Sequence, residues 1–273
     1  NYASSTDSYA RGGAIFNQGS ATIGNITGDF LNNYAKTSSD TRLAQGGAVY
    51  NSAAITFTSD ANTHFMFGNY TQDSRDKIYN AIYGEETSRI TLDTTGGGAW
   101  IINDNLEGGN YTFKGNDVVD TATGTTTQYV AMNNDIVNAA NVKVEGTTLR
   151  FDAYQHEDQT AKNWDGKGAF VASLNADGTA NRAAAAVTNL SLNNGVFDIA
   201  NGYLETVKLK GYSATDSFLH IDVDPDNMAA DVLNVAGNVE GVTKMIVHAS
   251  SNTDIRNRGQ ILFAQSENDT TGN

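Results

Sequence analysis

The feature that most constrains this chain is a near repeat close to its beginning. The stretch GGAIFN, Gly12–Asn17, recurs as GGAVYN, Gly46–Asn51, at an offset of 34 residues. Each copy runs on through alternating apolar positions to an aromatic residue and an asparagine, and a third variant, GGGAWIINDN, occupies 96–105. Self-similarity over tens of residues indicates stacked supersecondary units, because no single unit can bury its own apolar face.

The spacing of the apolar residues predicts strands. Ile55 and Phe57 alternate with polar residues in the second copy, and Ile23 and Ile26 recur along the first. Such short period-two runs are typical of strands, and no window sustains a helical period. The 27 glycines and the single proline agree, since Gly permits tight turns and Pro removes a backbone donor from a sheet. We therefore predict an all-β chain.

The glycine pairs and the asparagines have separate physical roles in such a stack. Successive strands lie about 4.8 Å apart, so a Cβ at a corner would crowd the next pass of the chain. Asparagine adopts the left-handed conformation at turns, and aligned asparagines can hydrogen-bond to one another along a stack. We expect ladders of this kind at the repeated asparagines.

Charge and composition exclude several functional classes. The chain has 31 acidic and 17 basic residues and a net charge of −14, which would repel a phosphate backbone, so nucleic acid is excluded as a partner. The absence of cysteine excludes disulfides and thiolate chemistry. No run approaches the roughly 20 apolar residues of a membrane-spanning helix, and the first residues do not read as a signal peptide. Both ends fall in mid-pattern, and we expect the chain to be a piece of a longer protein.

The motifs resemble one group of bacterial surface proteins. GGAIF and GGAVY, followed by FLNN and FKGN, resemble the GGA-I/L/V and F-x-x-N repeats of chlamydial polymorphic membrane proteins and related autotransporters. The region from Asp76 to Gly109 is similar to the passenger pattern in which an I-Y-N strand leads to an I-N-D-x-I/L-x-G turn. Val187–Gly202 and Ser217–Gly241 resemble the C-terminal part of many passengers.

The resemblance implies a fold and a cellular location. The fold is a right-handed parallel β-helix, or β-solenoid, forming one passenger domain over 1–273. Type V secretion would carry it to the bacterial cell surface or the exterior through a C-terminal outer-membrane barrel, expected beyond Asn273. The polar segment from Asp152 to Val187 departs from the repeat, and we interpret it as an extruded loop in which Trp164 is a candidate anchor for a partner.

No catalytic, cofactor-binding or metal-binding residue can be nominated. The four histidines, His64, His156, His220 and His248, are far apart and match no metal spacing, and no G-x-S-x-G elbow is present. We expect no cofactor.

Two weaker patterns have ordinary explanations. Asp222, Asp224 and Asp226 alternate around Pro225, which fits a turn, whereas a calcium site is the alternative that stays open. Five N-x-S/T matches are expected by chance in a chain this rich in Asn and Thr, and we assign them no function; they begin at Asn25, Asn69, Asn110, Asn189 and Asn268.

Three functional hypotheses remain. The leading one is a non-enzymatic adhesin or self-association module that binds a host or bacterial surface glycan or protein through a long β-helix face. The second is a β-helical polysaccharide-degrading enzyme, which would need several carboxylates and a basic residue converging on one face. The sequence does not allow such a group to be aligned. The third is a structural stalk that presents a distal domain.

Overall fold

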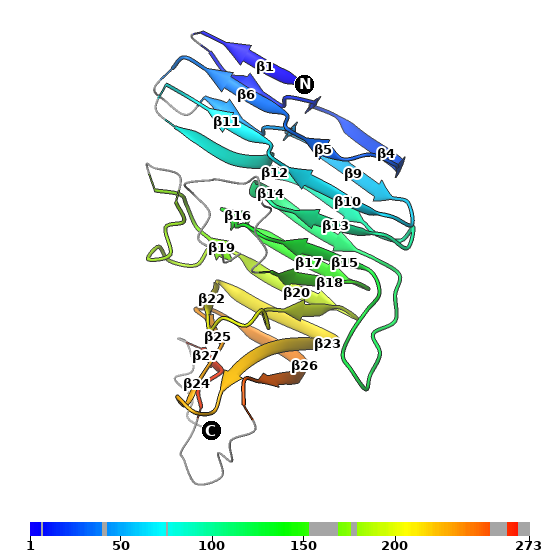
Figure 1. Cartoon of the computed structure of the whole chain (residues 1–273), viewed down its shortest axis with the longest axis vertical. Helices are drawn as coiled ribbons and strands as arrows, with labels where there is room; N and C mark the ends of the chain where they lie inside the picture. The colour runs from blue at the N-terminus through cyan, green and yellow to red at the C-terminus, as the bar shows by residue number, and fades with distance from the viewer. Residues whose placement is uncertain are drawn as a thin grey trace.

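The computed structural model describes residues 1–6, 8–39, 43–74, 76–152, 169–175, 179–251 and 261–266. These residues form 27 strands and no helix, which confirms the all-β prediction. Twenty-two of the strands belong to one sheet in which nearly all neighbouring strands run parallel. Figure 1 shows them stacked in a solenoid-like column, with the N-terminal strands at one end and the C-terminal strands at the other. Within the described ranges there is no helix long and apolar enough to cross a membrane.

Eight strands pair side by side along the whole column, and we call this series the long ladder. Each strand pairs in parallel with the next strand of the series. In order, the strands are β4 (Ser20–Ile26), β9 (Ala54–Ser59), β12 (Lys77–Asp93), β14 (Asn105–Lys114), β17 (Asn141–Glu145), β20 (Asn189–Asn193), β23 (Gly211–Asp224) and β26 (Val239–Ala249).

A second ladder runs beside the first. It ends on the C-terminal halves of β23 and β26, which are long enough to serve both ladders. Its other strands are β5 (Phe30–Leu31), β10 (Thr63–Phe67), β13 (Ala99–Ile102), β15 (Tyr129–Met132), β18 (Thr148–Phe151) and β21 (Val196–Asp198).

The remaining strands complete the column. Two contacts are antiparallel, β11 with β12 and β23 with β24, and the others are parallel. These strands are β1 (Tyr2–Ser5), β2 (Ala10–Arg11), β3 (Ile15–Asn17), β6 (Tyr34–Thr37), β7 (Ala44–Gln45), β8 (Val49–Asn51), β11 (Tyr70–Gln72), β16 (Ile136–Val137), β19 (Phe170–Val171), β22 (Thr206–Leu209), β24 (Ala229–Ala230), β25 (Val232–Val235) and β27 (Ala264–Ser266).

The core lies inside the column, where the alternating apolar residues meet. Ile55 and Phe57 of β9 are buried, as their period-two spacing predicts. Aromatic rings from different passes of the chain touch edge to face, for example Phe30 with Phe57 at a centroid distance of 5.5 Å. Because every pass adds apolar side chains to the same interior, the stack buries surface that no single repeat could bury.

The predicted glycine corners are present. Gly46 has a φ of 62°, and a Cβ there would lie 2.0 Å from the carbonyl oxygen of Val49. At Gly47 a Cβ would lie 2.3 Å from the amide nitrogen of Tyr70 and 2.6 Å from the carbonyl oxygen of Asn80. The first glycine of the pair thus supplies the left-handed turn, and the second allows two passes of backbone to approach.

The predicted asparagine ladders are also present. Asn17 Nδ2 donates to Asn51 Oδ1 at 2.7 Å, and Asn33 Nδ2 donates to Asn69 Oδ1 at 2.8 Å. The second ladder continues to a carboxylate, since Asn69 Nδ2 donates to Asp104 Oδ2 at 2.8 Å. Repeated positions therefore bond to one another directly along the stack.

Candidate functional site

The outward face of the long ladder carries a row of polar side chains, most of them the short hydroxyls of Thr and Ser. On the first seven strands the residues that flank this position point inward, so the position itself faces solvent, whereas on β26 the flanking Val239 is exposed as well. The strand register aligns one such residue from each of the eight strands, and we call this row the central column. It consists of Thr22, Thr56, Thr91, Thr112, Lys143, Ser191, Ser213 and Glu240. At a strand spacing of about 4.8 Å the column is about 34 Å long.

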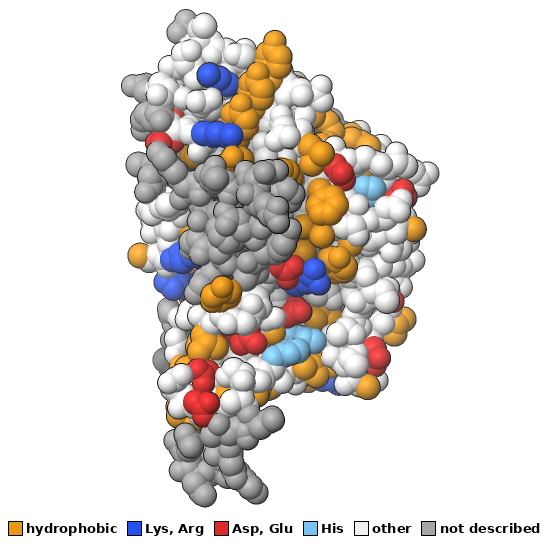
Figure 2. Space-filling view, in the orientation of Figure 1, with side chains coloured by type: hydrophobic (Ala, Val, Ile, Leu, Met, Phe, Trp, Pro, Cys, Tyr) orange, Lys and Arg blue, Asp and Glu red, His pale blue; other side chains and the backbone are white. Residues whose placement is uncertain are grey.

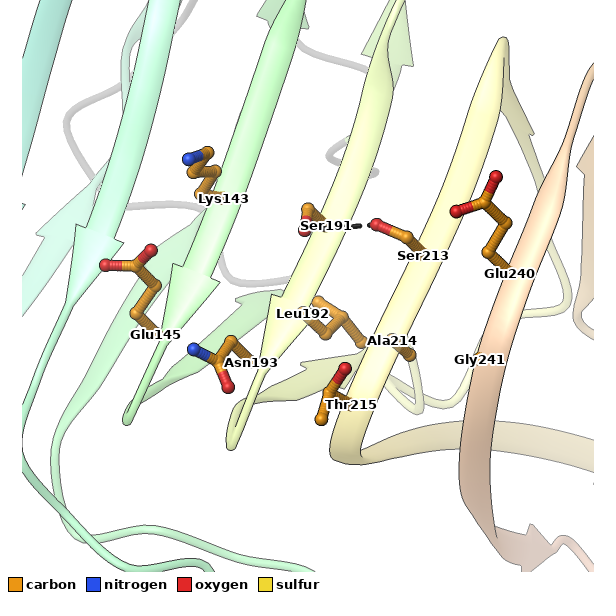
Figure 3. Close-up of a pocket in the computed structure, with 10 residues that line it drawn as sticks. All are labelled: Lys143, Glu145, Ser191, Leu192, Asn193, Ser213, Ala214, Thr215, Glu240 and Gly241. Atoms are coloured by element: carbon orange, nitrogen blue, oxygen red, sulfur yellow. Dashed lines mark hydrogen bonds between the residues drawn. The ribbon is translucent and has the colours of Figure 1, made fainter.

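The C-terminal half of this face is hollowed into a groove of about 530 Å³. Figure 3 shows its polar side chains projecting from neighbouring parallel strands, with Lys143 and Glu145 on β17 at one side and Glu240 on β26 at the other. Between them, Ser213 Oγ donates to Ser191 Oγ at 3.1 Å. The groove thus has hydroxyls at its centre and charged groups of both signs at its borders.

An asparagine ladder borders the groove. Asn141 Nδ2 donates to Asn110 Oδ1 at 2.7 Å, and Asn189 Nδ2 donates to Asn141 Oδ1 at 3.2 Å. Hydroxyl and amide groups both donate and accept hydrogen bonds without carrying charge. The face therefore offers neutral hydrogen-bonding groups between charged residues of both signs, and such groups can bind the hydroxyls of a sugar polymer.

A second group of side chains gathers on the outward face of the second ladder. Arg150, Asp198 and His220 are Cα partners on three successive strands, β18, β21 and β23. The Nε of Arg150 lies 3.0 Å from Asp152 Oδ2, and its guanidinium lies over the ring of Tyr129 at 4.1 Å. Figure 2 shows acidic, basic and histidine side chains in one region of this face, over β18, β23 and β26.

The carboxyl group of Asp152 is electrostatically perturbed. Burial raises its pKa, the charge of Arg150 opposes the rise, and the negative charge of Asp198 adds to it. Two neighbouring carboxylates beside an arginine, one of them with a raised pKa, are the kind of arrangement that acid–base catalysis uses. This convergence was missed from the sequence, because partners in this row are 48 and 22 residues apart instead of one repeat length.

The four histidines have different environments. His64 is buried, with Nε2 2.9 Å from Asp60 Oδ1 and its ring 5.3 Å from that of Trp100, so it belongs to the core. His220 and His248 are brought together on β23 and β26. His156 lies outside the described residues, as do Trp164 and Asn268.

The three aspartates around Pro225 do not form one cluster. Asp224 caps the turn between β23 and β24, because its Oδ1 accepts the amide hydrogens of Asp226 and Asn227 at 3.0 and 3.2 Å. Asp222 Oδ2 instead accepts the amide hydrogen of Gly202. Among the described residues no three metal-ligating side chains gather, and the turn explains this pattern.

Part of the segment predicted to be an extruded loop, Asp152–Val187, belongs to the stack. Phe170 and Val171 form β19, which pairs in parallel with Ile136 and Val137 of β16. Both side chains are buried, and the Phe170 ring lies 5.1 Å from that of Phe151. The described residues of this segment therefore include a short strand that continues the column.

Comparison with known proteins identifies no relative of this chain: no family model, no curated protein and no solved structure matches it. Any functional assignment must therefore come from the residues and their geometry.

Proposed function

We propose that this chain is the passenger domain of a bacterial autotransporter, folded as a right-handed parallel β-helix and acting as a non-enzymatic adhesin. The resemblance of its GGA-I/L/V and F-x-x-N repeats supports the family, and the solenoid-like stack of parallel strands is the arrangement that a β-helix requires. Such a domain acts at the bacterial surface or in the exterior after type V secretion.

The central column and its groove carry the functional part of this proposal. A column about 34 Å long, in which six of the eight side chains are hydroxyls at a constant spacing and which a shorter asparagine ladder flanks, suits a linear polymer with repeated hydroxyl groups. We therefore favour a host or bacterial surface glycan as the ligand. Individually weak contacts give a high overall avidity when many of them form along one rod or over many copies on one cell.

The test uses the domain displayed on otherwise non-adherent bacteria, with attachment to glycan-coated surfaces as the readout. Ser191→Arg places a long charged side chain in the groove, and we expect it to lower attachment by about tenfold or more. Ser4→Arg is the matched control, because Ser4 is exposed on β1, away from the groove. Circular dichroism of both purified variants checks that the fold is kept.

If the two variants attach equally well, the groove is not part of the binding surface. Aggregation of the displaying cells without glycan binding would favour self-association. If the displaying cells neither attach nor aggregate, the structural stalk is the function that remains.

A second candidate function is glycan cleavage, and the proximity of Asp152 and Asp198 to Arg150 favours it specifically. A carboxyl group of raised pKa can donate a proton to a leaving oxygen, while a neighbouring carboxylate acts as base or nucleophile. The arginine would hold an acidic sugar or a developing negative charge.

This candidate predicts the release of reducing ends when the purified domain is incubated with plant, host and bacterial polysaccharides. Asp198→Asn should abolish release, since the amide cannot act as a base yet can still accept the Ala200 amide hydrogen that Asp198 Oδ1 accepts at 3.0 Å. Release of reducing ends that survives both Asp198→Asn and Asp152→Asn would come from a contaminant or from another site. If the unmodified domain releases no reducing ends, the enzyme is ruled out and the adhesin remains the proposed function.

A further inference from the structure

Two histidines from neighbouring parallel strands face each other on the outer surface. His220 Nδ1 of β23 lies 3.0 Å from His248 Nε2 of β26, and the ring centroids are 5.1 Å apart. Figure 2 shows histidine side chains gathered over these two strands in the lower half of the view. His220 is only 3% exposed, whereas His248 is exposed to solvent. The pair therefore consists of a buried imidazole, that of His220, and a solvent-exposed imidazole, that of His248.

The protonation pattern of His220 is set by a contact on its far side. Its Nε2 lies 2.9 Å from the carbonyl oxygen of Gly124, which can only accept a hydrogen bond. The proton of the neutral ring therefore resides on Nε2, and Nδ1 presents a lone pair toward His248. Histidines that ligate metals are usually held in this way, with the second ring nitrogen donating to a carbonyl or carboxylate.

The segment that supplies this carbonyl packs closely against the strands. A Cβ at Gly124 would lie 2.7 Å from Phe218 Cδ1 and 2.9 Å from Ile246 Cγ1, and Val119 packs in the same small apolar cluster. The second-ladder strands place carboxylates nearby, because Asp198 is the Cα partner of His220 and Asp222 is the Cα partner of His248. The pair thus has a rigid apolar wall behind it and negative charge beside it.

We propose that His220 Nδ1 and His248 Nε2 bind one divalent transition-metal ion, with preference for Cu²⁺ over Ni²⁺ and Zn²⁺, and that water completes its coordination. Two nitrogens at about 2.0 Å from one ion in adjacent square-planar positions are about 2.8 Å apart, and in a tetrahedral site about 3.3 Å. The observed 3.0 Å lies between these values, so the two nitrogens already have the separation that binding requires, and a rotation of the rings would aim both lone pairs at the ion. Imidazole ligands and the general order of metal affinities favour copper.

The nearby carboxylates would offset the charge of the ion without displacing the two nitrogens. Since the described residues provide no third ligand in place, water can occupy the open positions and the ion should exchange readily. This site is independent of the groove on the long ladder and of the adhesin assignment.

The experiment is a titration of the tag-free domain with Cu²⁺, followed by calorimetry and by electron paramagnetic resonance. We expect one strong site per chain, with hyperfine structure from two nitrogen ligands. His248→Gln should weaken this site by at least about tenfold, because removal of a ligand costs at least as much as the loss of an outer contact. The glutamine amide can still donate to His220 Nδ1, so the hydrogen bond and the fold are preserved.

Two controls separate this pair from other copper-binding groups. Lys244→Gln changes a neighbouring position on β26, and His156→Gln removes a histidine outside the described residues; both should keep the two-nitrogen site. If His248→Gln binds copper as the unmodified domain does, or if the spectrum shows fewer than two nitrogens, the proposal is wrong. His248→Ala, at an exposed position, provides the same comparison should the glutamine variant be unstable.

Discussion

Replacing Gly47 with valine is expected to lower the free energy of unfolding by about 3 kcal/mol or more. The new Cβ would lie 2.3 Å from the amide nitrogen of Tyr70 and 2.6 Å from the carbonyl oxygen of Asn80. Both atoms are backbone, so neither can move aside by rotating a side chain. The amide of Gly47 also donates to the Asn80 carbonyl at 2.8 Å, and any separation of the two passes would lengthen this bond.

Urea unfolding followed by circular dichroism measures this effect, with Gly24→Val as the matched control. Gly24 lies in β4, and a Cβ there would meet nothing within 4 Å. The control should change stability by no more than about 0.5 kcal/mol. If Gly47→Val unfolds at the same urea concentration as the unmodified chain, the two passes are not held together at this corner as described.

The repeat near the N-terminus allowed the local structure to be predicted from the sequence. The offset of 34 residues places Asn17 beside Asn51 and stacks the Phe16 ring on the Tyr50 ring at a centroid distance of 5.1 Å. Each of these contacts joins equivalent positions of two copies. Where the repeat length is constant, a residue and its neighbour on the next pass can be found by counting.

The candidate sites could not be predicted in this way, because the length of each pass changes along the chain. Along the long ladder, Asn189 follows Asn141 by 48 residues, whereas Ser213 follows Ser191 by only 22. Counting at one repeat length therefore fails to align Arg150 with Asp198 or Lys143 with Ser191. Only the strand register reveals the central column and the row of Arg150, Asp198 and His220.

The contact of Gly124 with His220 illustrates a further limit. These residues are 96 positions apart, and the segment around Gly124 crosses to later strands instead of continuing the repeat. His220 lies on the outward face of β23, yet the packing of this segment buries its side chain. Tertiary packing across several passes leaves no periodic signal in the sequence.

The stability of the fold is expected to fall as the pH rises from 5.5 to 8, by about 2 kcal/mol for each of two buried aspartates. Burial raises the pKa of Asp104 to about 7, although hydrogen bonds from Asn69 and Gly68 oppose the rise. Burial likewise raises the pKa of Asp231 to about 7, and the nearby charges of Asp222 and Glu205 add to the effect. Both carboxyl groups therefore hold a proton in the folded state at a pH where the unfolded chain has lost it.

The sign follows from this difference in proton binding. An unfolded aspartate has a pKa of about 3.9, so between about pH 4 and 7 the folded state binds more protons, and raising the pH favours unfolding. Above about pH 8 both states are ionised and the dependence levels off. Urea unfolding from pH 5.5 to 8 measures the slope, and the lower limit stays above the isoelectric point of about 4.5, where aggregation would interfere. Asp231→Asn should remove about half of the slope, whereas a stability that rises with pH over this range would show that both carboxylates are ionised in the folded chain.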